Sequence, residues 1–251
     1  MKKILINIIQ RVLSRFGVRI AAISRIINSD SEFQEIYNMC APFTMTSEER
    51  MYTLYRSVEY VIKNDIEGDF VECGVWKGGS AMLIAMYLVK HNVLDRTIYL
   101  YDTYEGMPIP TSEDFKVGGD DKNNASKNWV NKKRDDHNDW CYSPHSEVQN
   151  NLLSTGIDSQ FVQLVKGKVE ETIPQVVPKS IALLRLDTDW YESTKHELVH
   201  LYPLLIKRGV LIIDDYGYWA GTKKAVDEYF HKTEILLSPI DSSGVIGVKC
   251  T

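Results

Sequence analysis

Two apolar runs, Ile181–Leu186 and Val210–Ile213, place the strongest constraint on the fold of this chain. Each run is followed at once by a pair of aspartates, which are Asp187 with Asp189 and Asp214 with Asp215. Between the runs, leucines recur at helical spacing, at Leu198, Leu201 and Leu205. This pattern predicts a strand–helix–strand unit, and its crossover makes the two strands parallel and adjacent.

The four aspartates predict a binding site for a divalent cation. Open α/β sheets place their ligands at the carboxyl ends of parallel strands, so we expect the two pairs to meet there. Carboxylates this close repel one another unless a cation lies among them, and oxygen ligands suit a hard ion such as Mg²⁺. The alternative is that the acids cap helices or form turns. We favour the metal site, because four acids follow two adjacent strands.

A glycine-rich turn after an earlier strand indicates a second ligand. The segment Asp69–Gly74 is expected to be a buried strand, and Gly78 and Gly79 let the backbone approach an anionic group at the start of a helix. The next predicted strand, Thr97–Asp102, ends in a carboxylate that can accept both hydroxyls of a ribose. The spacing of the turn departs from the GxGxxG pattern of dinucleotide sites. Together these features indicate a cofactor that contains adenosine.

The rest of the chain extends this pattern into one domain, residues 45–251. Strands alternate with helices and a terminal strand pair follows, which predicts a doubly wound, mostly parallel α/β sheet with an antiparallel last strand. Residues 108–150 are polar and show little apolar periodicity. A segment this long inside a compact domain is typical of a lid or binding loop, so we expect a lid insertion there.

Residues 1–44 precede this domain as a basic, amphipathic helical extension. The first 27 residues carry six basic side chains and no acid, with apolar residues at helical spacing. Three alternatives remain for this helix: packing on the domain, formation of a homodimer, or weak peripheral contact with an anionic membrane. Packing or dimerisation is favoured, because amphipathic helices are usually half-buried.

Composition excludes several other classes of protein. The net charge of −5 gives no reason to expect a nucleic-acid partner. The four cysteines are isolated in the sequence, which indicates neither a zinc site nor a disulfide framework and predicts a reducing, cytoplasmic location. No apolar stretch approaches the length of a membrane-spanning helix.

Five blocks of the sequence resemble the macrocin O-methyltransferase-type (TylF-like) family. They are Glu72–Ser80, Tyr101–Pro108, Gly167–Pro174, Leu184–Thr194 and Ile212–Gly217. The resemblance spans about residues 45–250 and implies the Rossmann-like fold of class I methyltransferases, with seven strands and the last antiparallel. Members of the family are S-adenosylmethionine- and Mg²⁺-dependent sugar O-methyltransferases of antibiotic and surface-glycan pathways. The partner that the resemblance implies is therefore a small-molecule sugar or nucleotide sugar.

The resemblance also implies a role for each matching residue. The methionine end and ribose of the cofactor are assigned to Glu72, Gly74, Ser80, Asp102 and Thr103. The adenine and a segment that closes over the cofactor are assigned to Val169, Glu170, Met45 and Thr46. The metal is assigned to Asp187, Asp214 and Asp215. The base that removes the hydroxyl proton is expected to be Asp187 first and Asp189 second.

The same residues also suit other functions. The same sheet suits an NAD(P)-dependent oxidoreductase, or a sugar-binding protein without catalysis. His196 and His200 are expected to be ordinary helix residues, whereas Trp76, Trp190 and Tyr191 suit either a sugar or the core. A basic run in the lid, Lys127, Lys132, Lys133 and Arg134, is expected to be solvated, with contact to sugar-linked phosphates as the alternative.

Overall fold

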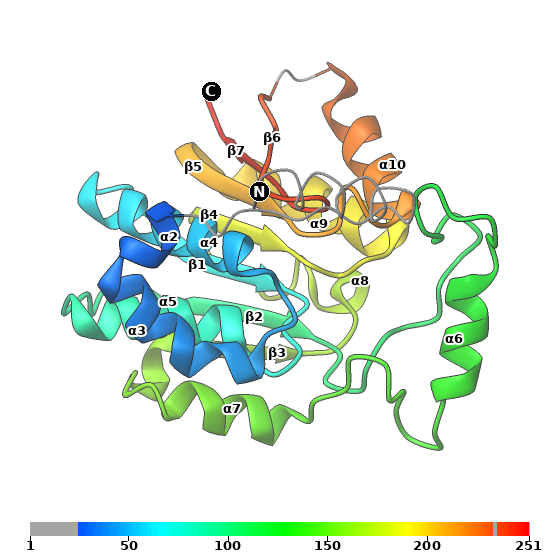
Figure 1. Ribbon diagram of the computed structural model, residues 1–251, viewed down its shortest axis with the longest axis horizontal. Helices are drawn as coiled ribbons and strands as arrows, with labels where there is room; N and C mark the ends of the chain where they lie inside the picture. Colours follow the sequence, from blue (N-terminus) through cyan, green and yellow to red (C-terminus); the bar gives the residue numbers. More distant parts are fainter. Residues whose placement is uncertain (1–24, 233–234, 251) are drawn as a thin grey trace, which may run out of the picture.

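A seven-stranded sheet forms the centre of the computed structural model, which describes residues 25–232 and 235–250 (Figure 1). The strand order is β3-β2-β1-β4-β5-β7-β6. The strands are β1 (Asp69–Cys73), β2 (Ile98–Asp102), β3 (Val162–Lys166), β4 (Ile181–Leu186), β5 (Leu205–Ile213), β6 (Ser238–Pro239) and β7 (Val245–Val248). Strand β7 runs antiparallel to both of its neighbours, β5 and β6, and the other strand pairs described are parallel. The predicted fold class is therefore confirmed.

Helices cover both faces of the sheet. They are α2 (Arg25–Ser29), α3 (Ser31–Cys40), α4 (Glu48–Lys63), α5 (Gly79–Lys90), α6 (Asn124–Lys132), α7 (His145–Leu153), α8 (Val169–Thr172), α9 (Tyr191–Leu201) and α10 (Ala220–Tyr229). One face packs against α3, α4, α5 and α7, and the other against α8, α9 and α10. Successive strand residues point to opposite faces, so Phe70 and Leu183 join the first layer while Val71 and Leu184 join the second.

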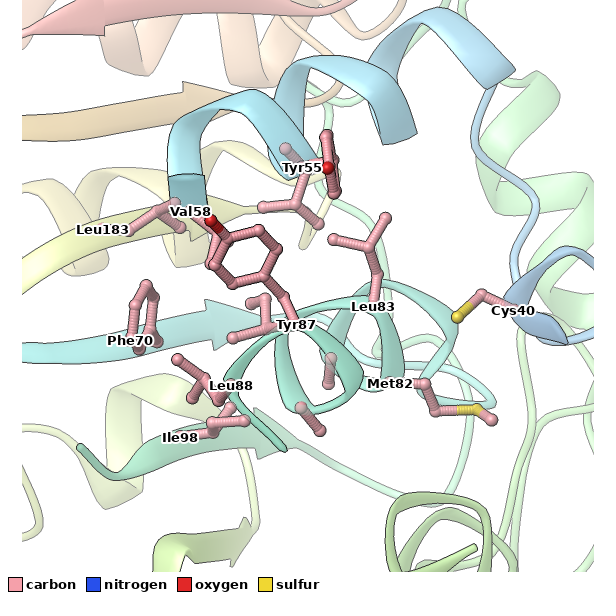
Figure 2. Close-up of a cluster of buried hydrophobic side chains, with 14 of the residues drawn as sticks. Cys40, Tyr55, Val58, Phe70, Met82, Leu83, Tyr87, Leu88, Ile98 and Leu183 are labelled. Atoms are coloured by element: carbon pink, nitrogen blue, oxygen red, sulfur yellow. The ribbon is translucent and has the colours of Figure 1, made fainter. Parts of the chain in front are cut away.

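The first layer is built mainly by α4 and α5. Figure 2 shows Tyr55 and Val58 of α4 together with Tyr87 and Leu88 of α5, gathered over the strand residue Phe70. Helix α4 begins after Ser47, a residue type typical of helix starts, and the Ser47 side chain accepts a hydrogen bond from the Arg50 amide. A helix that is apolar on nearly all sides, as α5 is, must be buried, and nine of its residues are buried.

The predicted strand–helix–strand unit is present as β4, α9 and β5, with β4 and β5 parallel. Two boundaries were predicted wrongly. Strand β5 begins at Leu205 rather than at Val210, and α9 ends at Leu201, so Leu205 belongs to the strand. The exposed residues Lys207 and Arg208 interrupt the apolar pattern of β5, so the sequence pattern does not predict the first half of this strand.

The predicted lid, residues 108–150, is more regular than its sequence suggests. It contains α6 and the first turns of α7, and α7 buries Val148 and Leu152 in the first helical layer. Helix α6 lies at the periphery (Figure 1) and buries only Ala125, which is why its sequence lacks an apolar stripe. The base of the lid is anchored: the Asp114 carboxylate accepts the Tyr191 amide of α9 at 2.7 Å.

Helix α3 lies within the predicted N-terminal extension, yet it belongs to the core. Its residues Phe33, Ile36 and Cys40 are buried in the same cluster as α4 and α5. The domain boundary at residue 44 remains a prediction, but the hydrophobic core begins before it. Residues 1–24 lie outside the described residues, so the three alternatives for the basic helix remain predictions. None of the described helices is long and apolar enough to cross a membrane.

We expect α3 to be required for stability of the domain. Phe33→Ala removes a fully buried ring and should lower the free energy of unfolding by about 3–5 kcal/mol. Met39→Ala, on the same helix but 51% exposed, should change it by less than ~1 kcal/mol. Urea denaturation followed by circular dichroism measures both. A small effect of Phe33→Ala would show that α3 is dispensable and that the domain starts near residue 45.

Candidate active site

A cavity of about 740 Å³ lies where β1, β2, β4 and β5 end. All residues predicted to bind the cofactor line it: Met45, Thr46, Glu72, Gly74, Ser80, Asp102, Thr103, Val169 and Glu170. The predicted metal ligands and bases line it as well: Asp187, Asp189, Asp214 and Asp215. The structure thus brings every predicted site residue to one cavity, and the role of each residue stays a prediction.

Glycine is required where two of the strand-end loops touch. Gly74 follows β1 with a φ of +82°, and a Cβ there would lie 1.9 Å from the Asp187 carbonyl oxygen. The Asp187 amide in turn donates to the Cys73 carbonyl at 2.8 Å. The loop after β1 and the acidic loop after β4 are therefore in backbone contact, which no side chain at position 74 would permit.

Asp102 joins the loops after β1 and β2. Its Oδ2 atom accepts the amides of Val75 at 2.7 Å and Trp76 at 3.1 Å, and its Oδ1 accepts that of Tyr104 at 2.8 Å. Burial raises the pKa of the Asp102 carboxyl, although these amides oppose the shift. The sequence did not predict this role in shaping the glycine-rich turn. Binding of a ribose by Asp102 remains a prediction.

Glu72 lines the cavity and has one buried carboxylate oxygen without a hydrogen-bond donor among the described residues. Its Oε1 atom accepts a hydrogen bond from Arg185 at 2.6 Å, whereas Oε2 has no partner among residues 25–232 and 235–250. Burial raises the pKa of Glu72 to about 7. A buried carboxylate oxygen without a donor is costly unless a ligand supplies one. The amino group of a methionine moiety fits this position, so the predicted cofactor is consistent with the residues present.

Three of the four aspartates lie close enough to share one ion. Carboxylate oxygens of Asp187, Asp214 and Asp215 all lie within 4.8 Å of one another. Two arginines that the sequence reading missed lie beside them. Arg185 contacts Asp187 and Asp214 at 2.8 Å each, and Arg50 forms an ion pair with Asp214. Cations therefore do lie among the aspartates, as the sequence predicts, and these guanidinium groups offset part of the repulsion.

Negative charge nevertheless remains in excess. Six carboxylates, those of Glu72, Asp241 and the four aspartates, lie around the two guanidinium groups of Arg50 and Arg185. Burial, reinforced by neighbouring acids, raises the pKa of Asp187 and Asp215 well above the usual range and that of Asp189 to about 7. A divalent cation would offset this excess, and an all-oxygen donor set suits Mg²⁺. The residues present therefore fit the predicted metal.

The turn that carries Asp187 and Asp189 is held from two sides. Asp189 has a φ of +68°, which an aspartate tolerates, and its carbonyl accepts the Thr222 hydroxyl at 2.6 Å. The Thr188 hydroxyl donates to Glu197, a residue of α9 that is fully buried. Burial raises the pKa of Glu197 well above its usual range. These contacts hold in place the turn whose two predicted bases line the cavity.

Aromatic residues close the lid side of the site. Trp190 and Trp219 are buried and pack edge to face, and Trp140 of the lid packs on both. The Trp190 indole donates to the Pro108 carbonyl at 3.0 Å. Trp190 and Tyr191 therefore serve packing, whereas Trp76 lines the cavity.

The remaining candidates from the sequence lie outside the cavity. His196 hydrogen-bonds the Ile173 carbonyl at 2.8 Å and packs against His200, in agreement with an ordinary helical role. None of the four basic lid residues lines the cavity: Lys127 pairs with Asp121 and Arg134 with Asp139. The lid instead contributes Lys116, Asn124, Asn128, Trp140 and Cys141 to the lining.

The raised pKa values of Glu72 and Asp189 predict a stability that falls with rising pH. Glu72 and Asp189 hold their protons more tightly in the folded protein than in the unfolded chain, where such groups ionise near pH 4. Their contribution to the free energy of unfolding is therefore fully present below about pH 4 and is lost as the pH rises through about 7. With EDTA present, we expect the melting temperature to drop by several degrees between pH 5.5 and pH 8.

Calorimetric melting curves test this expectation, with Asp189→Asn as the comparison. The variant should show a weaker pH dependence, because its amide does not titrate. Mg²⁺ should raise the melting temperature more at pH 8 than at pH 5.5, since its ligands must be ionised. An equal pH dependence in both proteins would contradict the assignment of a raised pKa to Asp189.

Comparison with known proteins identifies the family of this chain. Residues 30–249 match the family model described as Macrocin-O-methyltransferase (TylF). The chain is 34% identical over 204 residues to demethyldecarbamoylnovobiocin O-methyltransferase of Streptomyces niveus, covering 80% of this chain and 74% of that one. It is 33% identical, with the same coverage, to 8-demethyl-8-(2,3-dimethoxy-alpha-L-rhamnosyl)-tetracenomycin-C 4'-O-methyltransferase of Streptomyces olivaceus.

A solved structure shares the fold and much of the sequence. The O-methyltransferase NovP superposes with a TM-score of 0.72 at 33% identity, over 83% of both chains. The part of the chain that matches the family model contains α3, the glycine-rich turn and all four aspartates. This chain belongs to the macrocin O-methyltransferase (TylF) family of S-adenosylmethionine-dependent O-methyltransferases.

Proposed function

We propose that the protein methylates a hydroxyl group of a sugar, carried by a natural-product glycoside or a nucleotide sugar, and that it uses Mg²⁺. One observation carries the proposal: the residues suited to the cofactor and the cluster of three aspartates line a single cavity. The name of the Streptomyces olivaceus relative, which places its methylation on the 4'-oxygen of a rhamnosyl group, supports a sugar as acceptor. Family membership favours this function over an oxidoreductase or a non-catalytic sugar-binding protein.

Each part of the cavity has a role in this proposal. When bound, S-adenosylmethionine supplies an electrophilic methyl group, and Mg²⁺ supplies a Lewis acid that orients and acidifies the acceptor hydroxyl. The chain holds the methionine end with Glu72, Gly74 and Ser80. It holds the ribose and adenine with Asp102, Thr103, Val169 and Glu170, while Met45 and Thr46 close over them. It holds the metal with Asp187, Asp214 and Asp215.

Asp189 is the better candidate for the base, ahead of Asp187. Asp187 is paired with Arg185 at 2.8 Å and belongs to the metal cluster, both of which weaken it as a proton acceptor. Asp189 contacts neither arginine in the ion pairs of the described residues, and its pKa of about 7 suits proton transfer near neutral pH. We therefore propose that Asp189 accepts the proton that the acceptor hydroxyl loses.

The lid supplies the groups suited to the acceptor. Asn124 and Asn128 lie one helical turn apart on α6 and both line the cavity, as does Trp140. Amide side chains beside an aromatic ring match the hydroxyls and apolar faces of a sugar. We propose that the acceptor lies between these residues and the aspartates, with the lid excluding water.

The cellular setting completes the proposal. Cys40, Cys73, Cys141 and Cys250 are all free, as expected for a protein of the reducing cytoplasm. Two roles are proposed for the N-terminal segment: formation of a homodimer, and a weak membrane contact through residues 1–27. Gel filtration of the full chain and of a form that starts at residue 25 tests the homodimer, which only the full chain should form if the N-terminal helix is required.

Two variants separate the base from the metal site. Asp189→Asn should reduce kcat at least 100-fold and leave Mg²⁺ affinity within about threefold, because it removes the base but no ligand. Asp187→Asn should weaken Mg²⁺ binding itself. EDTA should abolish the activity of the unaltered protein, and Mg²⁺ should restore it. Methyl transfer to a panel of nucleotide sugars and glycosides, read by mass spectrometry, provides the assay.

The outcomes assign the roles separately. Full activity of exhaustively chelated protein would exclude the metal. A reduced kcat of Asp187→Asn with unchanged Mg²⁺ affinity would assign the role of the base to Asp187 instead of Asp189. Absence of methyl transfer to any sugar, with S-adenosylhomocysteine still bound, would point to another class of hydroxyl acceptor.

The acceptor site makes a further prediction for α6. Asn128→Ala should raise KM for the acceptor about fivefold, the loss expected for one hydrogen bond, and leave S-adenosylhomocysteine affinity unchanged. Ser126→Ala is the matched control, because Ser126 is exposed on the same helix and does not line the cavity. Equal KM values for both variants would remove α6 from the acceptor site.

A further inference from the structure

Arg185 is a buried cation in the middle of the sheet, and none of the predicted roles includes it. It lies on β4, its side chain is 3% exposed, and its neighbour in register on β1 is Glu72. The rest of β4 is apolar. A guanidinium group in this position loses its hydration, so it persists only where carboxylates surround it.

The contacts of Arg185 divide between the two halves of the active site. Its Nη1 atom lies 2.6 Å from Glu72 Oε1 and 2.8 Å from Asp187 Oδ2. Its Nη2 atom lies 2.8 Å from Asp214 Oδ1. One nitrogen therefore binds a carboxylate of the proposed cofactor half and a carboxylate of the proposed metal half at the same time.

The shared contacts leave one oxygen atom of Glu72 and one of Asp187 outside the ion pairs of Arg185. Glu72 Oε2 is buried and has no partner among the described residues, so Arg185 holds one oxygen of Glu72 while the other remains available. Asp187 likewise keeps Oδ1 outside its ion pair. The planar fork of a guanidinium fixes the direction of each carboxylate that it binds, which a single ammonium does not.

Arg50 does not duplicate this arrangement. Its ion pairs are with Asp214 and Asp241, on the metal side and in the β6–β7 turn. Among the described residues, only Arg185 forms ion pairs with both Glu72 and the aspartate cluster.

We propose that Arg185 is a positioning residue that aligns Glu72 for the cofactor and Asp187 and Asp214 for the metal, so that one side chain supports both binding sites. The inference rests on the proposed function, which assigns Glu72 to the cofactor and the aspartates to Mg²⁺. It predicts that a change at Arg185 weakens two ligands that bind in different places.

The experiment measures the two affinities separately by titration calorimetry, one with S-adenosylhomocysteine and the other with Mg²⁺. Arg185→Gln removes the charge and the fork, and Arg185→Lys keeps the charge but not the fork. Both variants should bind each ligand at least tenfold more weakly than the unaltered protein. Measurements well below the melting temperature of each variant separate alignment from loss of the fold, and Arg185→Lys provides the test if Arg185→Gln does not fold.

Two single-site variants serve as controls, because each lies in one half. Glu72→Gln should weaken S-adenosylhomocysteine alone, and Asp215→Asn, which has no contact with Arg185 among the ion pairs, should weaken Mg²⁺ alone. Failure of either control would overturn the proposed site assignment. If the controls behave as expected but Arg185→Lys binds both ligands normally, or loses only one, the positioning role of Arg185 is wrong.

Arg96→Lys controls for the loss of a guanidinium elsewhere. Arg96 is mostly buried and donates to the Gly68 carbonyl at 2.8 Å, at the opposite end of β1 from the site. This variant should leave both affinities unchanged. Weakening of both ligands by Arg96→Lys would show that general destabilisation, rather than alignment by Arg185, explains the result.

Discussion

The parallel pairing of β4 between β1 and β5 is the constraint on which the site depends. In this register Cys73, Leu186 and Ile213 end their strands side by side. The Asp187 amide bonds the Cys73 carbonyl, and the Asp214 amide bonds the Leu186 carbonyl, so the three loops begin at one level. Carboxylates that are 113 and 29 residues from Arg185 in the chain thereby reach one guanidinium group. The same alignment creates the cavity and its excess of negative charge.

Such a site opposes stability rather than adding to it. Buried ion pairs rarely repay the loss of hydration, and the raised pKa values of Glu72 and Asp189 show that protonation relieves the acids. The apolar layers on both faces of the sheet must therefore supply the stability. This division is typical of enzymes, in which groups arranged for chemistry are held in place by a core that takes no part in it.

The lid is connected to the same strand ends by different interactions. Asp114 binds the start of α9, and Trp190 binds the Pro108 carbonyl, so the base of the lid is attached directly beside Asp189. The Ala220 amide binds the Phe115 carbonyl at 2.8 Å, which ties the lid to the start of α10 as well. A segment fixed at its base but exposed along α6 can vary in sequence without disturbing the aspartate cluster. That arrangement suits a family whose members act on different acceptors.

The sequence by itself determined the main strands of the sheet, because apolar periodicity is a local property. It also determined that the acids after these strands lie together, because parallel strands end at one edge of the sheet. It also determined the start of α4, since a capping serine acts within one turn. Tertiary structure alone decided what Arg185 and Arg50 contact, although a charged residue inside the apolar run Ile181–Leu186 was a visible signal. It also decided that α3 joins the core and that Trp190 packs against the lid. Those outcomes depend on contacts between side chains that are far apart in the sequence. Such contacts produce no periodic pattern of residues, so the sequence alone does not reveal them.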